Sequence, residues 1–153
     1  MKMTHLLFCP IGPLLMTEEK GAIIALRFLR EGETCDTASP DTPLSRRTQR
    51  WLDRYFAGEN PAVDLPLAPA GTAFQQRVWH AVCDVACGET VSYGELARRI
   101  GCRSARAVGA ALGKNPVWIL IPCHRVIGAD GSLTGYEGGL DKKAALLALE
   151  KTT

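Results

Sequence analysis

The stretch TVSYGELARRIGCRSARAVGAALGK, from Thr90 to Lys114, predicts the fold of the second half of the chain. A first helix is expected to end at a short turn containing Gly101, and a second helix to begin at Ser104, a residue type that caps helix N-termini. Two helices joined by so short a turn form a helix-turn-helix. The second half is therefore predicted to be mostly helical.

The two faces of the second helix differ in character. One face is predicted to point to the core: Ala105, Val108, Ala111 and Leu112. The opposite face carries one arginine among small residues: Arg106, Gly109, Ala110 and Gly113. Glycine inside a helix costs about 1 kcal/mol relative to alanine, so these small residues indicate that a large object approaches closely. A second helix of the same protein and DNA both fit, and the flanking Arg98, Arg99 and Arg103 favour DNA.

Basic residues are concentrated in this region. The net charge of the 153 residues is only +2, but six basic side chains and no acidic one occur between Leu96 and Ala129. Such a one-signed stretch is typical of a solvated basic face and also of a surface that binds a polyanion. Charge alone leaves both interpretations open.

The remaining composition is that of an ordinary globular chain, with 46% hydrophobic residues, so it identifies no function. The apolar stretch Leu6–Met16 is interrupted by prolines and has no cleavage-like site after it. No run approaches the roughly 20 apolar residues of a membrane helix. We therefore expect a cytoplasmic protein with no membrane partner, whose six cysteines are free thiols.

The first half predicts a smaller unit of strands and one helix. Residues 3–30 are expected to form strands, with a turn-rich gap at 17–21 between two apolar runs, and residues 44–57 a helix. Three prolines between residues 60 and 71 exclude a helix and indicate an extended linker. We place the domain boundary there, which gives an N-terminal domain with linker at 1–71 and a C-terminal domain at 72–153.

A helix is predicted directly after the linker. Thr72 and Gln75 match the capping-box pattern at its start, and Gly88 is expected to end it. Cys83 and Cys87 would then lie one turn apart on this helix. A structural zinc site normally takes four ligands, and no others lie nearby, so we expect these cysteines to pack in the core and predict no metal site.

The chemistry is expected at Cys123. A short buried strand over Val117–Ile121 is predicted to lead into Pro122, Cys123, His124 and Arg125. A cysteine reacts as its thiolate, which a neighbouring base or positive charge favours. Adjacent residues of an extended chain point in opposite directions, so contact between Cys123 and His124 requires a turn or a bridging water.

Glu150 stands in the last turn of a helix predicted over residues 140–150. A carboxylate there opposes the helix dipole at a cost of a few tenths of a kcal/mol, which a cationic or hydrogen-bonding partner would offset. His124 is a candidate partner, and an exposed terminal glutamate is the other interpretation.

These motifs resemble those of a known family. Pro122-Cys123-His124-Arg125-Val126, preceded by Asn115-Pro116, resembles the active-site signature of the O6-alkylguanine-DNA alkyltransferases, or methylated-DNA–protein-cysteine methyltransferases. Further motifs match in the same order over residues 72–150: Phe74, Val91-Ser92-Tyr93, Ala105-Arg106-Ala107-Val108-Gly109, Gly135-Tyr136, Gly138-Gly139-Leu140 and Leu149-Glu150. The resemblance implies an α+β fold. A small ribonuclease H-like N-terminal domain would precede a mostly helical C-terminal domain with a winged-helix-like helix-turn-helix.

The resemblance also implies an activity. The alkyl group of O6-alkylguanine, and by extension of O4-alkylthymine, would pass from DNA to Cys123 in one turnover, with no cofactor. The partner would be double-stranded DNA, bound through the minor groove with the damaged base flipped out, and the protein would be a monomer. The catalytic residues implied are Cys123, His124, Glu150, Asn115 and Tyr93. The DNA- and substrate-binding residues implied are Arg106, Tyr93, Ala105, Gly109, Ala110, Gly113, Arg125, Val126, Tyr136 and Glu137.

Two positions depart from the family pattern. Trp118 stands where relatives often carry proline or a smaller residue, and Glu137 where a small or polar residue is common. Both departures concern the size and charge of the substrate pocket, and hence the preferred alkyl group.

Three other functions compete with this interpretation. A non-catalytic lesion sensor of the alkyltransferase-like type typically lacks the cysteine, which is present here as Cys123. An unrelated cysteine hydrolase needs an oxyanion hole and leaves the helix-turn-helix unexplained. A transcription factor usually carries polar base-reading side chains on its recognition helix, where this chain has small ones.

Overall fold

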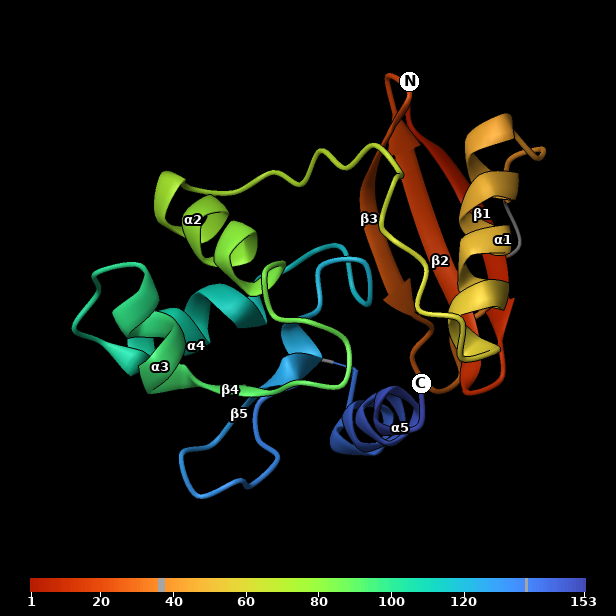
Figure 1. The fold of residues 1–153 in the computed structure, drawn as a ribbon. Helices are drawn as coiled ribbons and strands as arrows, with labels where there is room; N and C mark the ends of the chain where they lie inside the picture. The colour runs from red at the N-terminus through yellow and green to blue at the C-terminus, as the bar shows by residue number, and fades with distance from the viewer. Residues whose placement is uncertain (36–37, 137) are drawn as a thin grey trace.

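The computed structural model describes residues 1–35, 38–136 and 138–153 (Figure 1). The elements are β1 (Met3–Cys9), β2 (Gly12–Glu19), β3 (Ala22–Phe28), α1 (Pro43–Phe56), α2 (Ala73–Val82), β4 (Val91–Ser92), α3 (Tyr93–Arg99), α4 (Ala105–Gly113), the 3-10 turn η1 (Cys123–Arg125), β5 (Val126–Ile127) and α5 (Leu140–Lys151). The predicted α+β class is confirmed, with a small antiparallel sheet domain followed by a mostly helical domain.

The N-terminal sheet is built from three strands in sequence order. β1 pairs with β2, and β2 with β3, all antiparallel. The predicted gap at residues 17–21 contains the turn between two strands, and the second apolar run is β3, but the turn is shorter than predicted and the first run forms two strands. The first run breaks at Pro10 and Ile11, and β2 continues to Glu19. The chain then turns at Lys20 and Gly21, whose positive φ angles of 53° and 78° suit a tight hairpin turn.

Helix α1 packs against this sheet (Figure 1). Thr42 caps it in a capping box with Ser45, and Pro43 occupies the first turn, where its missing N–H is harmless. The buried residues of α1 recur at helical spacing, and the last of them is Tyr55. Tyr55 therefore lies in the last turn of α1.

The exposed edge of β3 is covered by two segments from farther along the chain. The linker pairs with Ile23, whose N–H donates to Pro66 O and whose carbonyl accepts from Ala68 N, both at 2.8 Å. Leu26 pairs in the same way with Pro116 O and Trp118 N, also at 2.8 Å. The segment that carries the proposed nucleophile is thus hydrogen-bonded to the N-terminal sheet.

The helix-turn-helix is confirmed as α3 and α4. Ser104 caps α4 by accepting a hydrogen bond from Ala107 N, and Gly101 takes a positive φ of 70° in the turn. Val108, Ala111 and Leu112 are buried as predicted. The prediction that Ala105 faces the core is wrong, since Ala105 is exposed.

Helix α2 begins as predicted, with the Thr72–Gln75 capping box, but ends at Val82 rather than near Gly88. Tighter turns follow, in which Asp84 N donates to Ala81 O and Val85 N to Val82 O. Cys83 and Cys87 therefore do not share a helix, and Cys83 is exposed rather than packed in the core.

The predicted strand over Val117–Ile121 is also wrong. Val117 makes one isolated bridge to Leu26, and the chain then turns, with Ile119 at a φ of 69°. Four of the five residues are nevertheless buried, Trp118 being the partly buried one. An apolar run of this length indicates burial without fixing the backbone conformation.

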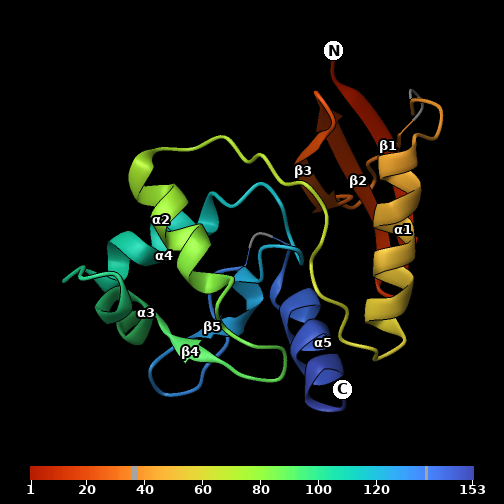
Figure 2. The same cartoon turned by 45° about the horizontal axis from the view of Figure 1, so that its top comes forward.

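Helix α5, the last element of the C-terminal domain, lies on the side of that domain that faces α1 (Figure 2). The position of α5 matters for the site because Glu150, in its last turn, can be reached from both domains.

None of the helices in the described part of the chain has the length and apolar character that a membrane-spanning helix needs.

Candidate active site

Cys123 begins the 3-10 turn η1, which separates the largely buried segment 117–122 from β5. Its N–H donates to Ile121 O at 2.8 Å, and its side chain is buried, with the residue 8% exposed. The structure thus supplies the turn that Cys123 and His124 require in order to share one site.

Asn115 holds the thiol. Its Nδ2 donates to Cys123 Sγ at 3.0 Å and to Ile121 O at 3.0 Å, while its Oδ1 accepts from Val117 N at 2.9 Å. Asn115 is itself buried, so its orientation is fixed by protein contacts alone. The amide therefore both shapes the turn and donates to the sulfur that would carry negative charge.

The thiol is protonated in the resting protein. Burial raises the pKa of Cys123, and the hydrogen bond from Asn115 offsets only part of this effect. A low dielectric disfavours the thiolate, and burial here outweighs the single amide donor. Reaction at this sulfur consequently requires a base that takes its proton.

His124 and Glu150 form a buried pair, with Nε2 and Oε2 2.6 Å apart. Burial alone would raise the pKa of Glu150, but hydrogen bonds from His124, Arg125 and Tyr55 lower it to about 2. Glu150 is then a carboxylate, which can only accept, so Nε2 of His124 carries the proton between them. Of the two interpretations of Glu150, the exposed terminal glutamate is wrong, since the residue is 2% exposed.

The second ring nitrogen of His124 is free to accept a proton. Burial lowers the pKa of His124, and the bond to Glu150 opposes this shift without reversing it, so the ring is neutral. A neutral imidazole that donates through Nε2 accepts through Nδ1. Nδ1 is buried and has no protein partner.

Arg125 is directed inward. The resemblance places it among the DNA-contacting residues, but its Nε and Nη2 donate to Glu150 at 2.8 and 3.1 Å, and its Nη1 donates to Val85 O at 2.7 Å. The guanidinium therefore anchors the carboxylate from one side.

Two residues near the site were missed by the sequence analysis. Tyr55 donates to Glu150 Oε2 at 2.5 Å, and Lys143 donates to Val126 O at 2.6 Å and Thr134 O at 2.7 Å. Lys143 is 1% exposed, and burial lowers its pKa to about 8. Its spacing of seven residues from Glu150 places both on one face of α5, which could have indicated Lys143.

The outer face of α4 is open to solvent. Arg106 and Ala110 are exposed, and Gly109 and Gly113 are partly buried. A Cβ at Gly109 would lie 3.7 Å from the Tyr93 ring, an ordinary contact, so packing within the chain does not require glycine there. Packing against a second helix of the same chain was one explanation for the small residues on this face. That explanation is wrong for the part of the face around Arg106 and Ala110, because both residues are exposed.

Tyr93 opens α3 and faces the loop that follows β5. Its hydroxyl donates to Thr134 O at 3.0 Å. In the same loop, the ring of Tyr136 packs at a tilt against the ring of Trp118, with their centroids 5.8 Å apart. The ring of Trp118 in turn packs against that of Phe28 in β3, with a centroid distance of 6.0 Å. The hydroxyl of Tyr136 is buried and has no protein partner. Glu137 lies outside the described residues.

Val126, the last of the predicted substrate-binding residues, follows η1 directly. Its N–H donates to Cys123 O, and its carbonyl accepts from Lys143. Among the residues that the structure describes, no three His, Cys, Asp or Glu side chains gather in a way that could hold a metal ion.

Comparison with known proteins covers both parts of the chain. Residues 73–152 match the DNA-binding domain of 6-O-methylguanine DNA methyltransferase, and residues 3–69 match its ribonuclease-like domain. The chain is 44% identical over 151 residues to the methylated-DNA–protein-cysteine methyltransferase of Methanosarcina mazei, covering 96% of both chains. It is 49% identical over 146 residues to that of Mycobacterium tuberculosis, covering 94% of this chain and 88% of the relative.

Solved structures agree over nearly the whole chain. The O6-methylguanine methyltransferase of Mycobacterium tuberculosis superposes with a TM-score of 0.89 at 45% identity, covering 99% of this chain and 94% of that one. A crystal structure of Mycobacterium tuberculosis OGT in complex with DNA matches with a TM-score of 0.88 at 46% identity, covering 98% and 93%.

Proposed function

The chain belongs to the 6-O-methylguanine DNA methyltransferase family, and we propose that it repairs DNA by transferring the alkyl group of O6-alkylguanine to Cys123. The observation that carries this assignment is the buried thiol of Cys123, which receives a hydrogen bond from Asn115 and is followed directly in the chain by His124, the partner of Glu150. This combination supplies a nucleophile, a donor that stabilises its charge and a base in one site.

Activation begins with loss of the thiol proton. A water between Cys123 Sγ and Nδ1 of His124 would pass the proton to the imidazole, because Nδ1 is the nitrogen without a protein partner. The resulting imidazolium is stabilised by Glu150, which remains ionised. Arg125 holds Glu150 in place and acts as a positioning residue.

The thiolate then attacks the alkyl carbon in a single displacement. The sulfur–carbon bond forms as the carbon–O6 bond breaks, and the electron pair of that bond moves onto the guanine. Tyr93 would donate a hydrogen bond to the guanine ring, which improves the leaving group by neutralising its developing charge. The product at Cys123 is a thioether, whose carbon–sulfur bond has no good leaving group, so each molecule reacts once.

DNA would be held on the exposed face of α4. Ala105, Gly109, Ala110 and Gly113 allow the helix to enter the minor groove, and Arg106 would occupy the space left by the flipped nucleotide. Backbone groups near Val126 and the side chain of Tyr136 would line the pocket, with Glu137 in the same loop. O4-alkylthymine is a second substrate that this pocket could accept.

Replacing Arg106 by alanine should separate base flipping from chemistry. We expect the variant to repair an O6-methylguanine duplex at least about tenfold more slowly. Flipping the base costs a few kcal/mol, and without the Arg106 side chain nothing fills the gap in the base stack to offset that cost. Its reaction with a free O6-alkylguanine base, which needs no flipping, should keep the wild-type rate. Both rates are read as alkyl groups bound per protein over time.

Arg103→Ala is the matched control, because it removes one positive charge from the turn before α4 and leaves the small-residue face intact. If Arg106→Ala reacted more slowly by the same factor with the duplex and with the free base, the variant would have a folding defect, and the role of Arg106 in flipping would be contradicted. A wild-type protein that accepts no alkyl group from either substrate would contradict the proposed function itself.

A further inference from the structure

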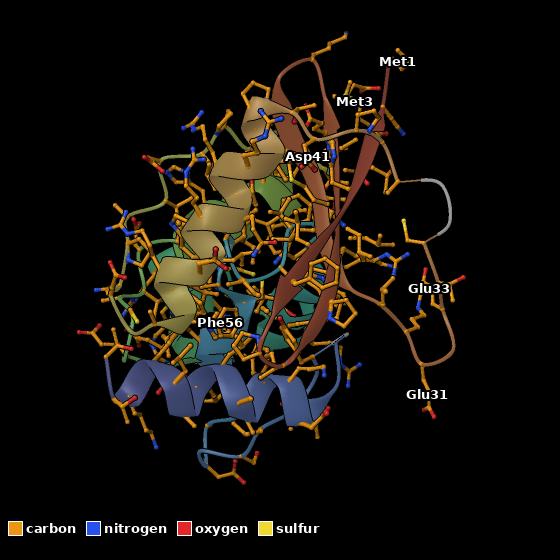
Figure 3. The ribbon with its side chains drawn as sticks, turned by 90° about the vertical axis from the view of Figure 1, so that its right-hand side faces the viewer. Met1, Met3, Glu31, Glu33, Asp41 and Phe56 are labelled. Carbon is orange, nitrogen blue, oxygen red and sulfur yellow. The ribbon has the colours of Figure 1, made fainter. Side chains whose placement is uncertain are left out.

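One side chain of the N-terminal domain reaches the proton relay. The hydroxyl of Tyr55 donates a hydrogen bond to Oε2 of Glu150, which lies 95 residues later in the chain. Figure 3 shows the end of α1, at Phe56, next to α5. Tyr55 and Glu150 are both buried, so no solvent competes for this bond.

We propose that Tyr55 is a positioning residue through which the N-terminal domain sets the orientation and the effective charge of Glu150. The inference rests on the proposed function, because it assigns a role within the relay. It also gives the N-terminal domain a part in the reaction that is separate from folding.

The contacts on Glu150 make Tyr55 a direct competitor of His124. Oε2 accepts from Tyr55, from His124 and from Nη2 of Arg125, while Oε1 accepts from Nε of Arg125. Each oxygen of a carboxylate has about two lone-pair sites, so the three donors on Oε2 must share them. Each hydrogen bond that Oε2 accepts withdraws some of its negative charge. Less negative charge is then left to stabilise the protonated form of His124.

The position of the Tyr55 hydroxyl is fixed by packing. Its ring stacks on Trp51 with centroids 5.2 Å apart and an interplanar angle of 12°, and it meets Phe56 edge-on at 5.0 Å. Burial and the neighbouring Glu150 raise the pKa of Tyr55, so the phenol keeps its proton and always donates. A locked donor of this kind holds one rotamer of the carboxylate.

The sign of the effect on His124 follows from this competition. Without the hydroxyl, Glu150 presents more negative charge to His124, which favours the imidazolium and raises the pKa of His124. The reaction needs the neutral imidazole, so the variant should be impaired most at low pH. Other ionisable groups lie close enough to influence this pair and are unchanged in the comparison: Cys87 from the loop after α2, Arg125 from η1, Tyr136 from the loop after β5, and Lys143 from α5.

The test is the rate of alkyl transfer by Tyr55→Phe and by the wild type between about pH 4 and pH 8, a range that extends below the ordinary titration of histidine because burial lowers the pKa of His124. The ratio of the variant rate to the wild-type rate should fall about three- to tenfold as the pH is lowered, which corresponds to a shift of up to one unit in the pKa of His124. Phe56→Leu is the control, because it disturbs the packing of the Tyr55 ring and leaves the hydroxyl bond in place. Its ratio should not depend on pH.

A ratio for Tyr55→Phe that is flat across this range, whether at unity or at a uniform loss, would overturn the inference. Should that variant not fold, a ring-fluorinated tyrosine at position 55 keeps the volume and donates more strongly. Its ratio to wild type should rise as the pH is lowered, and a flat ratio would again contradict the role. A wild type that accepts no alkyl group at any pH would count against the proposed function and not against this contact.

Discussion

Replacing Cys123 by serine is expected to abolish alkyl transfer while DNA binding is retained. A serine hydroxyl is far less acidic than a thiol, and oxygen attacks an alkyl carbon much less readily than a thiolate does, so displacement at the alkyl carbon should be lost in this buried site. The exposed face of α4 is untouched by the change. Transfer is followed with radiolabelled O6-methylguanine duplex, and binding by the retardation of the same duplex in a gel.

Cys83→Ser is the matched control, since Cys83 is an exposed thiol and should be dispensable. Full transfer in Cys123→Ser, or loss of label in Cys83→Ser, would falsify the assignment of the acceptor. Loss of DNA binding in Cys123→Ser would show that the variant is misfolded, and Cys123→Ala would then replace it.

The second large effect is expected for Glu150→Gln. A glutamine is neutral, so it stabilises the imidazolium of His124 less well and leaves Arg125 without its anionic partner. We expect the alkylation rate to fall about 10²-fold or more, the range typical of losing general-base assistance. Single-turnover time courses with DNA in excess measure this rate.

The final yield distinguishes catalysis from folding in that experiment. It should stay at one alkyl group per folded protein, because the number of acceptors depends on Cys123 alone. Glu59→Gln changes an exposed carboxylate paired with Arg54 and should keep the wild-type rate. An unchanged rate in Glu150→Gln would remove Glu150 from the relay and leave Cys123 as the acceptor.

Local signals predicted the helical half well because capping residues act on their own neighbours. The Thr72–Gln75 capping box and the Ser104 cap are both present as side-chain-to-backbone hydrogen bonds. Hydrophobicity was a weaker signal: it located the strand β3 but did not fix the backbone of Val117–Ile121. The apolar run Val117–Ile121 is buried between the sheet and the helices, but hydrogen bonds to β3 and a left-handed Ile119 determine its backbone.

Contacts between distant residues explain what the sequence analysis missed at the site. His124 and Glu150 were paired as candidates because a carboxylate at a helix C-terminus needs a partner, and the pair is present. Nothing local marks Tyr55, whose partner lies 95 residues away and whose own helix gives it an ordinary apolar position. The resemblance implied that Arg125 binds DNA or substrate, whereas its side chain pairs with Glu150 of α5.

The central claim is that one alkyl group passes from DNA to Cys123 of each molecule. The most direct measurement is mass spectrometry of the intact protein and of its peptides after incubation with excess O6-methylguanine duplex and no added cofactor. We predict a plateau at one added methyl group, located on the peptide that contains Cys123. A plateau well above one equivalent, or a methyl group on any other residue, would contradict the claim.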